Sequence, residues 1–178
     1  MTHSDIPNLH TTLRDDNLDC LTRMSRLIER LSDEQYSLDV TPCVSGIGAH
    51  VRHILDHYDA LLAGIASGTV DYDARQRDKQ TEYNRTIALQ RIAKTRAALM
   101  ALPTQALQQE LLVCMDCGST ASSRMATHSN TARELQFLVS HTVHHDALIA
   151  AAIVALDIEP EAGYGVAPST LRHQRQRA

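Results

Sequence analysis

The sequence predicts an all-α protein, an up-down four-helix bundle with a long loop or small hairpin before the last helix. Apolar residues recur at helical steps over four long segments, glycine or proline marks several of their ends, and the helical pattern fails for a long stretch only between residues 105 and 130. With 178 residues, 43% of them hydrophobic, the chain can bury one core. We therefore expect a single domain over residues 1–178, with the bundle at about 10–157 and a C-terminal extension at 158–178.

The first half of the chain is expected to hold two of the four helices. The first spans about residues 11–38, where apolar residues recur without an intervening proline or glycine. After a turn at residues 41–46, Ser45 is expected to cap a second helix that runs to about Ala66, where Ser67 and Gly68 stop it. The polar stretch 71–78 is expected to be a connection.

The second half is expected to hold the other two helices. The third runs from about Thr81 to Ala101 and ends before Pro103. Residues 105–130 are expected to form a long loop or a weak hairpin. Asn130 or Thr131 then caps a fourth helix that is apolar nearly all round, which is typical of a helix at the centre of a bundle.

Composition narrows the functional class. The net charge is -4 and acidic and basic residues are interleaved, which argues against a nucleic-acid-binding surface. The basic tail with Arg172, Arg175 and Arg177 is expected to be a solvated end. No apolar segment follows Met1, and no stretch reaches the roughly 18 apolar residues of a membrane span. We therefore expect a cytoplasmic location and no membrane association.

The cysteines and glycines give no sign of a disulfide framework or a nucleotide cofactor. Cys20, Cys43, Cys114 and Cys117 are too few and too scattered for a disulfide framework, so reduced thiols are expected. Cys114 and Cys117 form one C-x-x-C pair without a second pair, and we interpret it as a loop with two thiols. The glycine patterns of phosphate-binding and dinucleotide-binding loops are absent from the sequence.

Two groups of histidines are the strongest functional signal. His141 and His145 stand four residues apart in the fourth helix, which places them about 40° apart on one stripe, a spacing typical of metal ligands. His144 is displaced by about 100° and is not expected to reach the same ion. Buried imidazoles need partners, so the stripe indicates a metal site.

The second group is His50, His53 and His57, which lie within about 60° of one another on the second helix. If the two helices pack side by side, one of these imidazoles can join His141 and His145 on a divalent cation and leave positions open for water or substrate. Helical-wheel geometry alone favours His50 or His57, because both lie nearer to the apolar face of the helix than His53 does.

The segment Ser45-Gly-Ile-Gly-Ala-His50-Val-Arg-His53-Ile, followed about 90 residues later by His141-x-x-x-His145, resembles the DinB/YfiT-like superfamily of metal-binding four-helix bundles. The resemblance spans residues 10–157. It implies that one histidine of the second helix and the H-x-x-x-H pair hold a divalent ion, most often zinc or nickel, with iron in some relatives. By motif position these ligands are His53, His141 and His145, with His50 and His57 as alternates for the third.

The resemblance implies a metal-dependent hydrolase or a thiol-dependent transferase that acts on a small molecule not identified by the sequence. Glu134, two turns before His141, is the candidate general base, although a capping role at the start of its helix fits equally well. The alternative is a non-catalytic metal-binding or stress-response protein with a structural ion. Asp56, Asp146 and Glu134 are the candidate acceptors for the second N–H of a ligating imidazole. Family analogy and the apolar first and third helices favour a homodimer.

Overall fold

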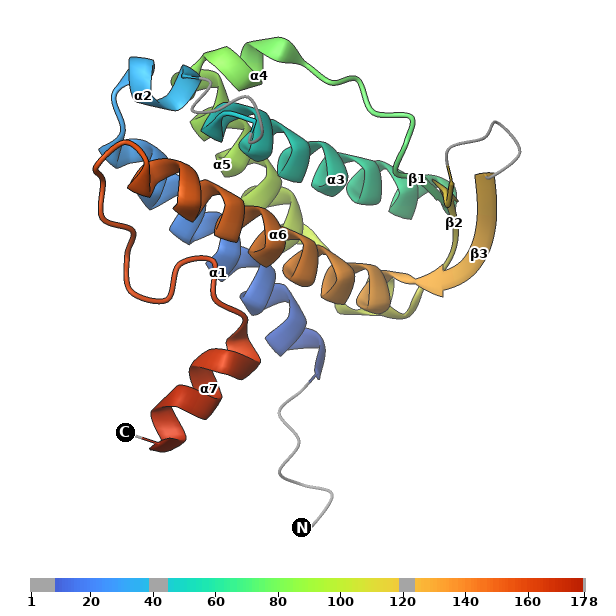
Figure 1. Ribbon diagram of the computed structural model, residues 1–178. Coiled ribbons are helices and arrows are strands. Elements are labelled where there is room, and N and C mark those ends of the chain that lie inside the picture. Colours follow the sequence, from blue (N-terminus) through green and yellow to red (C-terminus); the bar gives the residue numbers. More distant parts are fainter. Residues whose placement is uncertain (1–8, 39–44, 119–123, 178) are drawn as a thin grey trace.

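The computed structural model describes residues 9–38, 45–118 and 124–177, and four long helices dominate it (Figure 1). These are α1 (Leu9–Arg30), α3 (Ile47–Ser67), α5 (Arg85–Ala101) and α6 (Thr131–Val154). Shorter elements join them, namely α2 (Asp33–Ser37), α4 (Lys79–Tyr83), the 3₁₀-helix η1 (Thr104–Gln108) and α7 (Pro168–Arg177). Helices α1 and α3 each pack against both α5 and α6, which is the arrangement of a four-helix bundle.

The core of the bundle consists of apolar side chains contributed by all four long helices. Its fully buried members include Leu21, Met24, Ile28, Ile54, Leu55, Leu61, Ile92, Leu99, Leu135, Leu138 and Ile149. Burial of these side chains is the main favourable contribution to folding, at about 1.5–3 kcal/mol for each fully buried large apolar residue. It also fixes α3 and α6 side by side.

The prediction of one first helix to Leu38 was wrong. Helix α1 ends at Arg30, and a separate helix α2 begins after Ser32. The Ser32 hydroxyl accepts a hydrogen bond from the Gln35 amide at 3.1 Å, and the Gln35 side chain accepts one from the Ser32 amide at 2.9 Å. This capping box satisfies the amide groups of a new helix start, so the apolar pattern does not continue as one helix.

The structure confirms the predicted C-terminal end of α3, whereas the N-cap residue lies one position later than predicted. Gly46, rather than Ser45, occupies the N-cap position, and glycine has no side chain with which to make a capping bond. At the other end Gly68 adopts φ +79°, and its amide donates to the Gly64 carbonyl at 2.8 Å. This left-handed residue ends the helix as predicted, because glycine adopts that conformation without a Cβ penalty.

A small sheet lies at one end of the bundle and corrects the all-α prediction to a mainly helical fold. Its strands are β1 (Thr69–Asp71), β2 (Glu110–Asp116) and β3 (Arg124–Asn130), in the order β1-β2-β3. The predicted hairpin is the antiparallel β2–β3 pair, in which Met115 faces Met125. Strand β1 was not predicted; it pairs in parallel with β2, with Val70 opposite Val113.

Helix α6 is less central than its sequence predicts. Asn130 caps it by accepting a hydrogen bond from the Arg133 amide at 2.9 Å, as expected. It packs against α1 and α3 but leaves another side exposed, where Val154 is 58% accessible. By length and composition α6 is the one helix among the described residues that would also suffice to span a membrane. Core helices of bundles have the same composition, and α6 contributes to the core here.

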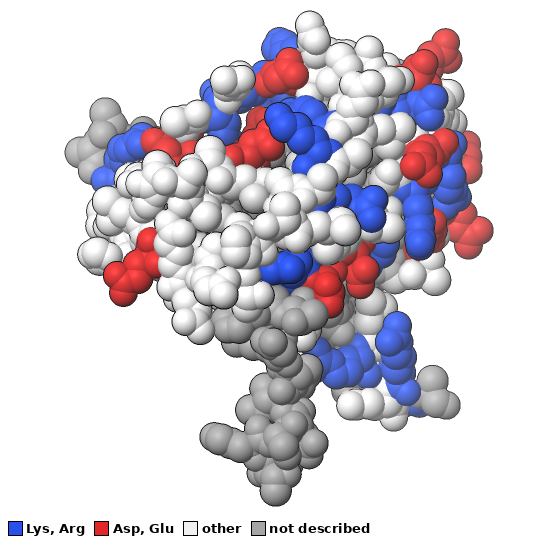
Figure 2. All heavy atoms as spheres, turned by 180° about the vertical axis from the view of Figure 1, so that it is seen from behind, with Lys and Arg blue, Asp and Glu red and all other residues white. Residues whose placement is uncertain are grey.

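Charged residues of both signs are distributed over the surface, as Figure 2 shows for the face opposite to that in Figure 1. The basic tail forms α7, a helix that was not predicted and that has no buried residue. Arg172 and Arg175 line a cleft of about 530 Å³ together with residues of α1 and α6. Asp16 and Asp19 of α1 also line it, so this cleft is of mixed charge.

Candidate metal centre

Histidines of α3 and α6 meet where the two helices pack together. His53 comes from α3, and His141 and His145 come from successive turns of α6. One ring nitrogen from each of the three lies within 4.8 Å of the other two. Nitrogens bound to one ion at about 2.1 Å lie within about 4.2 Å of one another, so small side-chain rotations would suffice for coordination. We call these three residues the His triad; they form a group that could hold a metal ion.

The His triad lies at the edge of the bundle, where all three side chains are half-buried. Its rings are close to one another, with centroid separations of 5.0 Å for His53 and His141, 4.5 Å for His53 and His145, and 4.6 Å for His141 and His145. An edge position keeps one side of the group accessible to solvent. The two α6 imidazoles are therefore half-buried and not enclosed in the apolar interior.

The surroundings keep the His triad uncharged at neutral pH. Burial, followed by the nearby His57, lowers the pKa of His53 to about 2. Burial and His57 also lower the pKa of His141 to about 4, and burial and His141 lower that of His145 to about 3. A neutral imidazole has a lone pair available for a metal, whereas a protonated one does not.

One atom of the His triad lacks a partner. The Nε2 atom of His141 is buried and makes no hydrogen bond. A buried polar atom without a partner costs about 1–3 kcal/mol, and such atoms are uncommon in folded proteins. Coordination of a metal ion by this nitrogen would remove the cost, so the donor set fits an imidazole-binding divalent ion such as zinc, nickel or iron.

The two alternate ligands, His50 and His57, surround the His triad. His50 Nδ1 lies 3.0 Å from His145 Nδ1, and His57 Nδ1 lies 2.8 Å from the His53 carbonyl oxygen. Both side chains are buried, at 8% and 6% exposure, so the helical wheel correctly placed them nearer to the core than His53. The group of converging nitrogens nevertheless contains His53, as the motif position implied. The exposed His144 lies beside it and is not part of the group.

Comparison with known proteins gives the family. The model of the DinB family matches residues 13–175, which is nearly the whole chain. This chain belongs to the DinB family. The match extends beyond residue 157 and reaches into α7, ending two residues before the end of that helix. The DinB chain is also similar to FK506-binding protein 5 of Rhizopus delemar, with 29% identity over 108 residues. That match covers 61% of the DinB chain and 28% of the Rhizopus protein.

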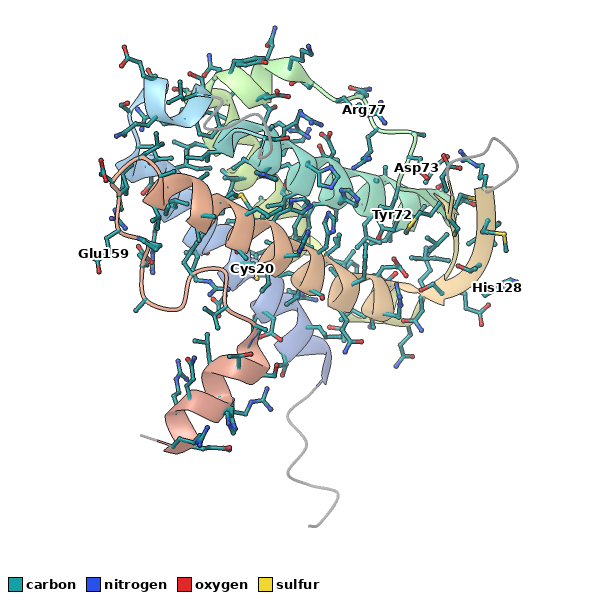
Figure 3. The ribbon with its side chains drawn as sticks, in the orientation of Figure 1. Cys20, Tyr72, Asp73, Arg77, His128 and Glu159 are labelled. Atoms are coloured by element: carbon teal, nitrogen blue, oxygen red, sulfur yellow. The ribbon has the colours of Figure 1, made fainter. Side chains whose placement is uncertain are left out.

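Glu134 of the DinB chain is buried at the start of α6, with 1% exposure. Its carboxylate accepts hydrogen bonds from Tyr72 Oη at 2.9 Å, from Ser129 Oγ and from Arg133 at 3.0 Å. Capping of α6 is provided by Asn130, so the capping role weighed for Glu134 is filled by another residue. The Tyr72 ring stacks on His57 at 5.3 Å and thus lies between Glu134 and the histidines (Figure 3 labels Tyr72). The role of Glu134 as a general base stays a prediction.

The other acids near the histidines have partners elsewhere. Asp56 is paired with Arg52 at 2.9 Å and with Arg91 at 3.1 Å. Asp146 accepts a hydrogen bond from Tyr164 at 2.8 Å, and burial raises its pKa to about 6. Within the described ranges no hydrogen bond joins either carboxylate to a histidine of the triad, so neither candidate acceptor is used in this structure. His145 has His50 as its hydrogen-bond partner instead.

Arg75 is the residue that sequence reasoning missed. It lies between β1 and α4, in the stretch interpreted as a polar connection, and its Nη1 atom is 2.9 Å from His53 Nδ1. No pattern marks it, because only the fold brings this loop over α3.

The cysteines lie apart from the His triad. Cys114 is on β2 and is partly exposed, Cys117 follows that strand and is exposed, and Cys20 is buried in α1. These three are free thiols, as expected, and Cys43 lies outside the described residues. Burial raises the pKa of Cys20, which disfavours its reactive thiolate.

Proposed function

We propose that this DinB-family protein binds one divalent metal ion through His53, His141 and His145 and uses it in catalysis. The observation that supports this most directly is the set of three neutral imidazoles whose ligand atoms lie within 4.8 Å of one another, together with the buried Nε2 atom of His141, which has no hydrogen bond. Zinc or nickel suits three imidazole nitrogens, and iron is a further candidate.

The proposed activity is that of a metal-dependent hydrolase or a thiol-dependent transferase acting on a small molecule. An ion held by three nitrogens keeps at least one position open, and there it lowers the pKa of bound water or activates a thiolate. The chain's own contribution is positioning. His50 orients His145 through the 3.0 Å contact, and the apolar contact between α3 and α6 holds the ligands of the two helices together.

A structural ion is the alternative, and one observation favours it: the ligands come from two different helices, so that the ion would join α3 to α6. The coordination sphere separates the two functions. A site with an open position that exchanges water supports catalysis, whereas a sphere filled by protein atoms supports a structural ion. A homodimer and a cytoplasmic location remain predictions from the sequence.

The test is to replace His50, His53, His57, His141, His144 and His145 singly by alanine and to measure bound metal per chain in protein purified without a histidine tag. We expect His53→Ala, His141→Ala and His145→Ala to lose nearly all bound metal, because two nitrogens compete poorly with water for the ion.

His144→Ala is the matched control, since it removes an exposed imidazole next to a proposed ligand and should retain full occupancy. Full occupancy in His141→Ala would contradict the proposed site.

A further inference from the structure

The loop that carries Arg75 is held in place over α3. The Asp71 carboxylate accepts hydrogen bonds from the amides of Asp73 at 3.0 Å and Ala74 at 3.1 Å. Tyr72 lies between Asp71 and Asp73 in the sequence. Its side chain is buried, with 1% exposure, and its hydroxyl donates a hydrogen bond to Glu134. These contacts place the half-buried Arg75 next to the His triad.

The guanidinium of Arg75 contacts imidazoles and has no carboxylate partner among the described residues. Nη1 lies 2.9 Å from His53 Nδ1 and 3.4 Å from His57 Nε2. Nε is buried without a hydrogen bond, and none of the ion pairs formed within the described part of the chain includes Arg75. The acids whose charges act on Arg75, Asp56 and Asp73, are used elsewhere, because Asp56 pairs with Arg52 and Arg91 and the Asp73 carboxylate accepts a hydrogen bond from the Asp116 amide.

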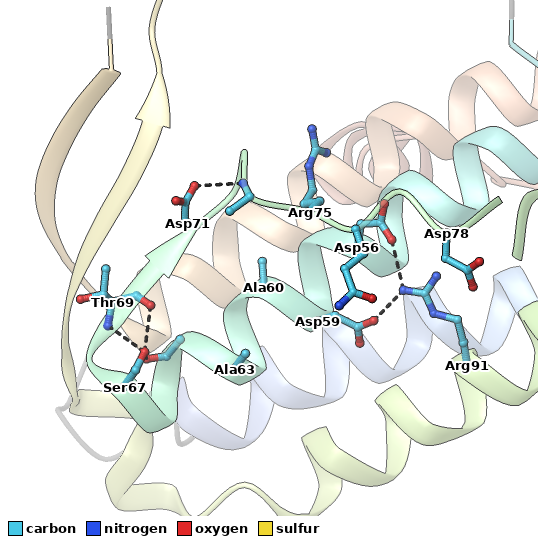
Figure 4. Close-up of a pocket in the computed structure, with 13 residues that line it drawn as sticks. Asp56, Asp59, Ala60, Ala63, Ser67, Thr69, Asp71, Arg75, Asp78 and Arg91 are labelled. Carbon is cyan, nitrogen blue, oxygen red and sulfur yellow. Dashed lines mark hydrogen bonds and ion pairs between the residues drawn. The ribbon is translucent and has the colours of Figure 1, made fainter. Parts of the chain in front are cut away.

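Arg75 is also one of the residues that line a cleft of mixed charge beside its loop, together with Arg91 and several acids. That cleft, of about 510 Å³, is lined by Asp56, Asp59, Asp71 and Asp78 among others (Figure 4). Figure 4 shows Asp56 and Asp59 turned to Arg91, while Arg75 extends from the loop in another direction. Among the described residues, the Arg75 guanidinium makes hydrogen bonds to histidines and to none of these carboxylates.

Metal binding by His53 is incompatible with the hydrogen bond that Arg75 makes to it. A guanidinium only donates, so His53 Nδ1 must offer a lone pair to Nη1. If Nδ1 coordinates the ion, that lone pair is used. If Nε2 coordinates, the neutral ring carries its proton on Nδ1, which then cannot accept. In either case a permanently charged, half-buried guanidinium loses its closest acceptor beside a metal ion and is left with its longer contacts to His57.

We propose that Arg75 is the anchor for a carboxylate on the substrate, so that the metal centre selects small molecules that carry a carboxylate next to the group bound by the ion. This inference rests on the proposed function. A carboxylate supplies the acceptor that Arg75 loses on metal binding. Its negative charge also compensates the neighbouring positive charges of Arg75 and the metal ion. Guanidinium groups bind carboxylates through strong, charge-assisted hydrogen bonds.

The experiment compares two thiols that differ in one group. Mercaptoacetate carries a carboxylate beside its thiol, and 2-mercaptoacetamide carries a neutral amide there. The protein is loaded with Co²⁺, and the dissociation constant of each thiol is measured from the thiolate-to-cobalt absorption band. The ratio of the two constants is then compared between the wild type and Arg75→Gln, which cancels the difference in acidity between the thiols.

We expect Arg75→Gln to lose about tenfold or more of the wild-type preference for mercaptoacetate, the effect of one charge-assisted hydrogen bond. Metal affinity should stay unchanged or increase, because a competing donor and a positive charge are removed. Arg77→Gln is the matched control, since it removes an exposed charge from the same loop and should keep the wild-type preference. Arg75→Met, which retains the aliphatic stem, should behave as Arg75→Gln does.

An unchanged preference in metal-loaded Arg75→Gln and Arg75→Met would overturn the inference and leave the proposed metal site intact. A wild-type protein that binds no divalent ion would overturn both. An equal loss of preference in Arg77→Gln would also overturn the inference, because it would show an effect of net charge and not of Arg75.

Discussion

Two polar clusters lie along the contact between α3 and α6, and they differ in how well their hydrogen bonds are satisfied. In the first, Tyr58 donates to Asn17 at 2.8 Å and Asn17 donates to the Leu135 carbonyl at 3.1 Å. Thr142 lies 3.5 Å from the Tyr58 hydroxyl, and all three side chains have 0% exposure. The second cluster is the histidine group, which is partly exposed and includes buried ring nitrogens of His50 and His141 without partners.

The two clusters are adjacent in sequence, since Tyr58 follows His57 and Thr142 follows His141. A rotation of about 100° along each helix separates the buried network from the half-exposed histidines. The complete network has what a structural role requires, because every buried polar group in it has a partner. The histidine cluster, in contrast, has buried ring nitrogens without partners, which can bind a ligand. Polar groups that the protein leaves unpaired are therefore the better guide to its function.

Acidification should have the largest effect and should act through the histidine cluster. His53, His57, His141 and His145 have folded-state pKa values of about 2 to 4, below the unfolded value of about 6.5. The unfolded chain therefore binds more protons below pH 6.5, and the free energy of unfolding falls as the pH drops from 6.5 toward 4.

Asp146 opposes this trend, because its pKa is raised to about 6 and the folded state takes up its proton first. On unfolding near pH 5, the four imidazoles each bind a proton and the one carboxyl releases its proton. We therefore expect a net uptake of about three protons. Urea unfolding at several pH values in the presence of a chelator measures it. Stability that does not change between pH 6.5 and 5 would contradict the assignment of neutral, protected imidazoles.

The Asn17→Ala substitution should reduce the free energy of unfolding by about 3 kcal/mol, because it leaves the buried Tyr58 hydroxyl and the Leu135 carbonyl with fewer partners. Bound metal per chain should not change. Urea unfolding and metal analysis of the same samples measure both quantities. Asp15→Ala, an exposed change on the same helix, is the control and should stay within about 0.5 kcal/mol of the wild type. Loss of metal in Asn17→Ala would show that the two clusters are not independent.

The smallest effect is expected for His50→Leu, which removes the partner of His145 Nδ1 without removing a ligand. Loss of such an orienting contact reduces metal affinity by about tenfold or more, while stoichiometric binding persists at high metal concentration. A competition titration with a chromophoric chelator measures the change. An affinity as low as that of His145→Ala would make His50 a ligand and require a different set of three histidines.

The parts of the fold that are determined locally could be predicted from the sequence. The glycine end of α3 at Gly68 was predicted and is confirmed, and of the two predicted caps of α6, Asn130 and Thr131, the structure has Asn130. Both features could be predicted because they depend on residues within one helical turn. The break between α1 and α2 also had a local signal, the Ser32-x-x-Gln35 capping box, but the apolar pattern obscured it. Strand β1 had none, since three residues become a strand only by pairing with β2, about 40 positions later.

The candidate site shows the same division. The spacing of His141 and His145 is a local property and predicted their convergence. The prediction of His53 as the third ligand came from the family motif, because the helical wheel ranks histidines by burial and His53 is less buried than His50 and His57. Arg75 and the His50–His145 contact depend on how loops and helices pack, which no periodicity records.

The small sheet gives the two histidine-bearing helices a common anchor at one end. Strand β1 continues from α3 after Gly68, and β3 leads directly into α6, with β2 hydrogen-bonded between them. The distance between the C-terminal end of α3 and the N-terminal end of α6 is thus set by the width of three paired strands. An insertion within these strands would alter the separation of His53 and His141, whereas one between α6 and α7 would leave it unchanged. Tolerance to insertion should therefore differ sharply between the two ends of α6.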